Sequence, residues 1–158
     1  MYKLFAMDVD GTLTDGSVLM DGSGSEYKRF NIQDGMGIAR FRAAGGKVAF
    51  ISGRYSAATE LRARELHVDF LANGIGEKLP KLIQIADQLG IKPSEVAYIG
   101  DDVNDLDCAR WVGLGIAVAN AVPELKEAAD LVTTREGGNG AVREVADLLL
   151  SSNRKETE

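Results

Sequence analysis

The sequence is poor in cysteine and histidine, with one residue of each type among 158. A single thiol, Cys108, cannot form an intramolecular disulfide, so the chain lacks the framework that holds small secreted domains together. Cys108 falls in the expected helix "NDLDCARWV", where we interpret it as a small packing residue. His67 lies away from every motif described below, and we interpret it as a surface residue at the end of a helix.

Long apolar runs are also absent. No run approaches the roughly 20 residues needed to cross a bilayer, and Asp8 interrupts the N-terminal "MYKLFAMDVDG" before the core of a signal peptide develops. Basic residues are outnumbered, 18 against 24 acids, which gives a formal charge of −6. An acidic chain argues against a nucleic-acid footprint. We therefore expect a cytoplasmic protein that binds neither membrane nor nucleic acid.

What the sequence does contain is a regular alternation of strand-like and helix-like segments. Expected strands cover residues 2–9, 47–52, 68–72, 95–100, 114–119 and 130–134, and expected helices cover 35–46, 56–66, 77–90, 104–112, 122–129 and 140–150. Such alternation predicts an α/β fold, a doubly wound parallel sheet covered by helices on both faces. In such sheets the ligand binds beyond the carboxyl ends of the strands.

Two segments fall outside this alternation. "DGSGS" lies between two short strand-like pieces, so residues of about 16–31 are predicted to form a β-hairpin flap. The tail 151–158, "SSNRKETE", is polar and without apolar periodicity, and it is predicted to be flexible beyond a single domain over 1–150. The glycine pairs at 35/37 and 113/115 lack the third glycine of a dinucleotide-binding fingerprint, which argues against a nucleotide cofactor.

Polar side chains follow the carboxyl ends of four expected strands. They are Asp8 and Asp10, then Ser52 and Arg54, then Asn73 and Lys78, and finally Asp101, Asp102, Asn104 and Asp105. Taken singly, each has an ordinary structural explanation, such as a helix cap for Ser52 or a solvated first-turn lysine for Lys78. Independent surface positions have no reason to converge in this way, so the set predicts a site at one edge of the sheet.

The chemistry of this set suits phosphoryl transfer. Asp8, Asp10 and Asp101 offer the hard oxygen ligands that Mg²⁺ prefers. Two carboxylates about 4 Å apart repel by about 4 kcal/mol at an effective dielectric near 20, so the site needs the metal and Lys78 to hold a phosphate. With these cations present, one carboxylate can attack phosphorus to give an aspartyl phosphate. The second is then free to transfer protons.

Four motifs resemble those of the haloacid dehalogenase superfamily: "DVDGT" (8–12), "SGR" (52–54), Lys78 and "GDDVND" (100–105). The resemblance implies that Asp8 is the nucleophile, Asp10 the general acid/base, and Ser52 and Lys78 the residues that bind the phosphoryl group. It also implies a metal site of Asp8, Asp101 and the backbone carbonyl of Asp10, supported by Asp102 or Asp105. An aspartate at position 10 marks the phosphatase branch of the superfamily.

The spacing of the motifs leaves no room for a cap domain, the separate lid that many members of this superfamily carry. The segment from Asp10 to Ser52 is long enough for the hairpin and one helix, and the segment from Ser52 to Lys78 for one helix and one strand. A site without a cap is open to water. Either the substrate is large, or another subunit covers the site.

Nearly the whole chain is similar to the capless phosphatases that act on 3-deoxy-D-manno-octulosonate 8-phosphate, a lipopolysaccharide precursor. The similarity lies in "DGSVLMDGSGSEYKRFNIQDGMGI", "GEKL", "VAYIGDDVND" and "GGNGAVREV". It implies a homotetramer in which hairpins cover neighbouring active sites. It also implies substrate contacts at Asp10, Asn31, Ile32, Gln33, Asp34, Gly35, Arg54, Arg62 and Lys78. Arginines and a lysine suit a substrate with a carboxylate and a phosphate.

Two positions depart from that pattern and keep the exact sugar open. Gln33 and Asn139 stand where the family usually has arginine, and both changes remove positive charge. A sister group that acts on nine-carbon sugar phosphates typically has glutamate where this chain has Arg54, which favours the eight-carbon sugar. Alternatives from other classes are a signalling receiver domain, which would have adjacent acids after its first strand, and a non-catalytic phosphate-binding regulator.

Overall fold

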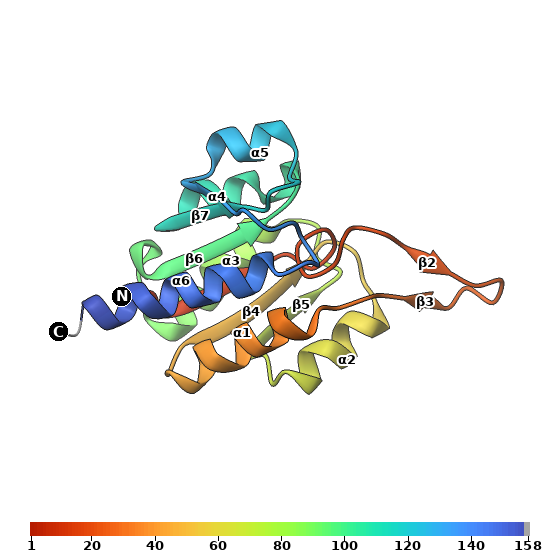
Figure 1. Ribbon diagram of the computed structural model, residues 1–158, viewed down its shortest axis with the longest axis horizontal. Coiled ribbons are helices and arrows are strands. Elements are labelled where there is room, and N and C mark those ends of the chain that lie inside the picture. The colour runs from red at the N-terminus through yellow and green to blue at the C-terminus, as the bar shows by residue number, and fades with distance from the viewer. Residues whose placement is uncertain (157–158) are drawn as a thin grey trace.

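A six-stranded parallel sheet with the order β5-β4-β1-β6-β7-β8 forms the centre of the computed structural model, which describes residues 1–156 (Figure 1). The strands are β1 (Leu4–Met7), β4 (Lys47–Ser52), β5 (Phe70–Asn73), β6 (Val96–Gly100), β7 (Leu114–Ala117) and β8 (Leu131–Val132). Every neighbouring pair runs parallel. The predicted α/β class is confirmed.

Helices cover both faces of this sheet. They are α1 (Ile32–Ala43), α2 (Ala57–Glu65), α3 (Lys78–Leu89), α4 (Leu106–Trp111), α5 (Pro123–Ala128) and α6 (Ala141–Lys155), with short 3-10 turns η1 (Pro93–Glu95) and η2 (Val103–Asp105). Helices α1 and α6 lie side by side on one face, and α3 lies on the other (Figure 1). No cap domain occurs among the described residues, and no helix among them is both long and apolar enough to cross a membrane.

Strand β1 is the most enclosed element. All four of its residues are fully buried, because β4 and β6 pair with its two edges and helices cover both faces. Phe5 and Met7 pack into the core under α1 and α6, whereas Leu4 and Ala6 pack into the core under α3 and α4. Burial of a Phe, Leu or Met side chain stabilises a fold by about 1.5–3 kcal/mol. The residue that follows β1, Asp8, is therefore held firmly in the middle of the sheet edge.

The predicted hairpin is present. Strand β2 (Leu19–Met20) pairs antiparallel with β3 (Glu26–Tyr27) and projects from the body of the molecule (Figure 1). Its turn is organised by Asp21, whose Oδ1 accepts hydrogen bonds from the backbone N–H groups of Ser23 and Ser25, both at 2.9 Å.

The end of the chain differs from its prediction. Helix α6 continues through Lys155, so a flexible tail over 151–158 is wrong at least to that residue. The physical reason is Asn153, whose side chain accepts from the N–H of Tyr2 at 2.7 Å and donates to its carbonyl at 2.8 Å. These two bonds dock the last turns of α6 on the N-terminal segment. Residues 157–158 lie outside the described part of the chain.

The single cysteine and the single histidine lie as expected. Cys108 lies on the buried side of α4, in the core that this helix and α3 form with the sheet, and burial raises the pKa of its thiol to about 12. His67 is exposed and follows the end of α2 with a positive φ of 53°. Neither residue lines the site described next.

Candidate active site

The carboxyl ends of the central strands open onto one cavity, with a volume of about 520 Å³. It is lined by Asp8, Asp10, Gly16, Gly53, Arg54, Ile75, Gly76, Asp101, Asp102 and Asn104. These residues come from the loops after β1, β4, β5 and β6. The structure therefore brings Asp8, Asp10, Arg54 and Asp101 together at the sheet edge where the strand pattern predicts a ligand site.

The loop after β1 is shaped by close packing against Asp101. Gly11 has a φ of +85°, and a Cβ atom there would lie 1.9 Å from Oδ2 of Asp101. Only glycine tolerates both this left-handed conformation and this proximity. Within the same loop the hydroxyl of Thr12 lies 3.3 Å from Oδ2 of Asp8 and donates to it. The turn thus sets the position of Asp8 relative to Asp101.

Lys78, the first residue of α3, reaches Asp8 from the far side. Its Nζ lies 2.6 Å from Oδ1 of Asp8 and 2.8 Å from Oδ1 of Asp105, and its side chain is 2% exposed. Burial acts to lower the pKa of Lys78, but the two carboxylates outweigh it and raise that pKa above its usual value. Lys78 is therefore a fixed positive charge beside Asp8.

Asp105 supports this arrangement from behind. Its Oδ1 also accepts from the hydroxyl of Tyr98 at 2.5 Å, and its Oδ2 accepts from the backbone N–H groups of Asp101 at 2.9 Å and Asp102 at 3.2 Å. Both of its oxygens are thus engaged within the protein. We assign Asp105 to the support of Lys78 and of the Asp101 loop. Support of the metal by Asp102 or Asp105 stays a prediction.

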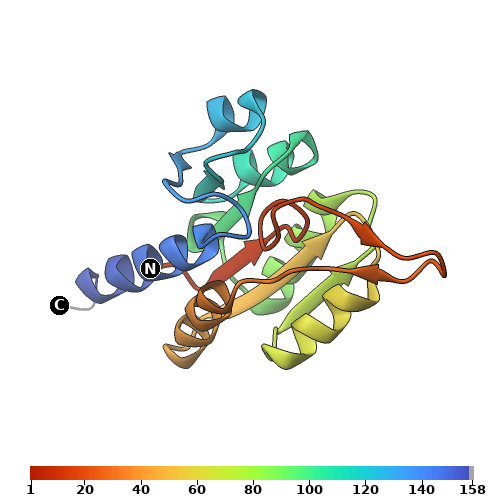
Figure 2. The ribbon, with the colours of Figure 1, turned by 45° about the vertical axis from the view of Figure 1, so that its right-hand side comes forward.

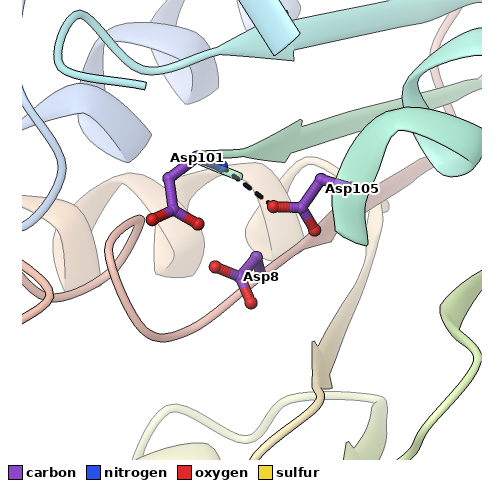
Figure 3. Close-up of side chains that lie close together, drawn as sticks. All are labelled: Asp8, Asp101 and Asp105. Atoms are coloured by element: carbon purple, nitrogen blue, oxygen red, sulfur yellow. Dashed lines mark hydrogen bonds between the residues drawn. The ribbon is translucent and has the colours of Figure 1, made fainter. Parts of the chain in front are cut away.

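Figure 3 shows the carboxylates of Asp8, Asp101 and Asp105 converging. One oxygen from each of the three lies within 4.8 Å of the others. Burial raises the pKa of Asp8, and the charge of Asp105 raises it further. Burial and the nearby Asp8 likewise raise the pKa of Asp101. Hard carboxylate oxygens that repel one another in this way fit a divalent cation, which Asp8 and Asp101 could hold.

The side chain of Asp10 turns toward the hairpin. Its Oδ1 forms an ion pair with Nζ of Lys28, which also lies 2.9 Å from Oε1 of Glu26. Glu26 in turn binds Arg54, with 2.8 Å between Oε2 and Nη2. The sequence alone does not identify Lys28 or Glu26. A usable signal exists in "EYKRF", because alternate residues of an extended segment lie on one side.

Ser52 is buried at the end of β4, next to the cavity. Its hydroxyl donates to the backbone carbonyl of Arg54 at 2.8 Å. Asn73, at the end of β5, binds the backbone of Ser56, accepting from its N–H at 3.0 Å and donating to its carbonyl at 2.8 Å. Asn73 therefore shapes the start of α2. Phosphate binding by Ser52 and Lys78 stays a prediction.

The other predicted substrate contacts form a separate group at the start of α1, to which Arg62 of α2 adds its side chain. Asn31, Ile32, Gln33, Asp34, Gly35 and Arg62 do not line the cavity around Asp8 in the described chain. Oδ1 of Asn31 caps α1 by accepting from the N–H of Gln33 at 2.8 Å. Arg62 lies over the ring of Phe30 at 5.5 Å and donates to the carbonyl of Asn31 at 3.4 Å. Their contact with a substrate stays a prediction.

Asp34 is the buried member of this second group. It is 1% exposed, and its Oδ1 accepts from the N–H of Arg143 at 3.0 Å. Burial raises its pKa. Oε1 of Gln33 accepts from Arg135 at 3.2 Å, so an arginine from elsewhere in the chain lies beside Gln33.

Comparisons with known proteins agree with this geometry. A family model described as haloacid dehalogenase-like hydrolase matches residues 67–145. The 3-deoxy-D-manno-octulosonate 8-phosphate phosphatase KdsC of Escherichia coli (strain K12) is 43% identical over 153 residues, which cover 97% of this chain and 81% of the relative.

Two solved structures are also similar. The phosphatase of the same name from Moraxella catarrhalis, in complex with magnesium ion, phosphate ion and a KDO molecule, superposes with a TM-score of 0.93 at 45% identity and covers 95% of this chain and 86% of its own. The cobalt-bound deoxy-D-mannose-octulosonate 8-phosphate phosphatase from Haemophilus influenzae has a TM-score of 0.92 at 37% identity, and the match covers 95% of this chain and 88% of that relative. With its four motifs on the predicted strand ends and these relatives along nearly its whole length, the chain belongs to the haloacid dehalogenase-like hydrolases.

Proposed function

We propose that the protein hydrolyses the phosphate monoester of a sugar acid, 3-deoxy-D-manno-octulosonate 8-phosphate, to the free sugar acid and phosphate, with Mg²⁺ as cofactor. The observation that carries this proposal is the buried contact of Lys78 with Asp8, opposite the carboxylate of Asp101. The named activity of the E. coli relative, and the ions and sugar in the M. catarrhalis structure, support the substrate and the metal.

Each step of the reaction falls to a residue of this site. Asp8, held by Lys78 and Thr12, attacks phosphorus through a carboxylate oxygen, and the bond to the sugar oxygen breaks. A proton on Asp10 passes to that leaving oxygen, so the sugar acid is released with a neutral hydroxyl group. Water then attacks phosphorus of the aspartyl phosphate while Asp10 takes a proton from that water. The bond from phosphorus to the Asp8 oxygen breaks, which releases phosphate and regenerates the Asp8 carboxylate. Bound Mg²⁺ supplies positive charge that offsets the phosphoryl oxygens, and Asp8 and Asp101 would hold it.

The charge of the chain makes local cations necessary for this substrate. A molecule with a formal charge of −6 repels an anion that carries both phosphate and carboxylate. Arg54 lines the cavity, Lys78 contacts Asp8 beside it, and both oppose this repulsion. We extend the proposal to a homotetramer in which the group at Asn31–Gly35 and Arg62 serves a neighbouring site, since it lies outside the cavity of its own chain. A cytoplasmic location completes the proposal.

Phosphate release from eight-carbon and nine-carbon sugar-acid phosphates, with and without Mg²⁺, tests the function. We expect Mg²⁺-dependent release, at least tenfold higher kcat/KM for the eight-carbon substrate, and no release by Asp8→Asn, because the attacking oxygen is lost. Asp10→Asn should lose turnover by about 100-fold or more and keep Mg²⁺ binding, because only proton transfer is removed. No release from either substrate by the wild type with Mg²⁺ would contradict the proposal.

A further inference from the structure

Two charged side chains of the hairpin segment contact residues of the cavity: Glu26 binds Arg54, and Lys28 binds Asp10. Glu26 lies on the returning strand β3 and Lys28 directly follows that strand; the two are two residues apart, and alternate residues of an extended segment lie on one side. Figure 2 shows this strand rejoining the body beside the loop that follows β1. Arg29, between them and α1, is 70% exposed and lies 3.6 Å from Asp15 instead. The hairpin thus presents one face to the cavity and another to solvent.

Four side chains of alternating charge form a row of ion pairs between the hairpin and the loops after β1 and β4. They run from Arg54 through Glu26 and Lys28 to Asp10, with 2.8 Å between Arg54 and Glu26 and 2.9 Å between Glu26 and Lys28. The side chain of Lys28 is only 1% exposed, whereas that of Asp10 is 26% exposed. Lysine is almost never fully buried unless paired, because its ammonium needs partners in place of water. Lys28 is thus tied to the two carboxylates.

The ion pair with Lys28 also fixes the position of the Asp10 carboxylate. Among the described residues, Asp10 forms an ion pair only with Lys28. Its neighbour across the loop, Asp8, is held instead by Lys78. Without Lys28, a partly exposed carboxylate next to other acids would turn into solvent. A misplacement of about 1 Å is enough to slow a catalysed step by about 100-fold.

We propose that Lys28 is a positioning residue, which fixes the Asp10 carboxylate at the cavity and so couples docking of the hairpin to proton transfer. The proposal rests on the proposed function, because it takes Asp10 as the proton-transferring group. Lys28 itself contacts neither the Lys78–Asp8 pair nor the Asp101 loop in the described contacts. Its loss is therefore expected to lower kcat and to leave KM nearly unchanged.

The test compares kcat and KM of the full-length protein with Mg²⁺ and the eight-carbon sugar phosphate. Lys28→Met removes the ammonium and keeps the aliphatic stem, and Lys28→Arg keeps the charge. Arg29→Met is the matched control, because it removes one cation from the same hairpin without touching Asp10. We expect kcat to fall at least tenfold in Lys28→Met with KM within threefold, to stay within about fivefold in Lys28→Arg, and to stay within twofold in Arg29→Met.

Several results would overturn the inference. They are a kcat of Lys28→Met within threefold of wild type, a rise in KM that matches the fall in kcat, or an equal loss in Arg29→Met. Lys28→Gln serves as the second variant, and if neither it nor Lys28→Met folds, Lys28 is structural and the inference is wrong. An inactive wild type would instead refute the proposed function, so the two failures are distinguishable.

Discussion

At position 11 the structure has room for a hydrogen atom and nothing larger. Gly11 lies between Asp101 on one side and the glycine loop before α6 on the other, where a Cβ on Gly137 would lie 1.9 Å from the carbonyl oxygen of Gly11. The backbone of Gly138 donates to the carbonyl of Thr12 at 2.9 Å. Two loops that are distant in sequence thus fix the turn after β1, which carries the proposed catalytic residues Asp8 and Asp10.

Gly11→Ala should therefore damage the site as well as the fold. A side chain in the left-handed region costs about 1–3 kcal/mol, and the new methyl group would displace the Asp101 carboxylate. We expect a lower thermal midpoint and at least tenfold weaker Mg²⁺ binding by calorimetry. Gly22→Ala is the control, because nothing lies within 4 Å of a Cβ at that position. Equal Mg²⁺ affinity in Gly11→Ala and wild type would show that this packing does not set the metal site.

The ion pairs of Lys78 are buried, and their contribution to stability can be compared with that of an exposed pair. Lys78→Met leaves Asp8 and Asp105 buried together without a cation, and removal of one partner of a buried pair costs about 3–5 kcal/mol. Lys47→Met removes an exposed lysine that lies 3.2 Å from Asp69, and such pairs contribute about 0–1 kcal/mol. Urea unfolding of the metal-free proteins should show this difference. A loss below 1 kcal/mol in Lys78→Met would mean that the acids are protonated or solvated instead.

At the scale of elements, the sequence predicts what local patterns determine. The apolar runs give every strand of the sheet, and Ser56 caps α2 as expected, accepting from the N–H of Thr59. Helix α1 begins at Ile32, three residues before its prediction, because Asn31 caps it where no apolar repeat marks the start. Strand-end residues are predictable for the same reason as the strands, since parallel topology alone brings them together.

Contacts between distant segments are what local patterns miss. Lys28 looks like a surface lysine until the hairpin folds back over the loop after β1. The polarity of 151–155 predicts a tail, but a side chain that meets the backbone at Tyr2 overrides it. The position of Asn31–Gly35 outside the cavity likewise depends on how α1 leaves the hairpin.

The docked end of α6 gives a prediction of its own. Asn153→Ala removes the two hydrogen bonds to the partly buried backbone N–H and carbonyl of Tyr2. We therefore expect the free energy of unfolding to fall by about 1–3 kcal/mol. Hydrogen exchange should increase in the last turns of α6 and in residues 1–3. Asn139→Ala is the control, because its amide donates to the nearby carbonyl of Gly137 and not to a distant segment among the described residues. Unchanged exchange in Asn153→Ala would contradict the docking role.

For the whole molecule, the acidic cluster ties stability to pH. Burial raises the pKa values of Asp8 and Asp101 above their value of about 3.9 in an unfolded chain. The metal-free folded state therefore binds more protons than the unfolded state, and this contribution to stability is lost as pH rises through the raised pKa values. Mg²⁺ takes the place of those protons, so its stabilising effect should grow with pH.

Thermal unfolding at pH 5.5 and pH 8, with EDTA or with Mg²⁺, measures this coupling. We expect the midpoint of the metal-free protein to fall by several degrees at the higher pH, since about 1 kcal/mol shifts a domain of this size by roughly 2–4 °C. The shift produced by Mg²⁺ should be larger at pH 8. Asp101→Asn is the control, because one fewer buried acid should flatten the pH dependence. A larger Mg²⁺ shift at pH 5.5 would contradict the account.

The order of strands in the sheet has a consequence for the growing chain. Strand β1 is synthesised first, yet its two neighbours are β4 and β6, which follow much later. Until β6 leaves the ribosome, β1 has one open edge and Asp8 has neither Asp101 nor Asp105 beside it. Such non-local pairing slows folding. The nascent chain therefore acquires its fold and its catalytic centre in the same late event, and no shorter N-terminal fragment that ends before β6 contains either.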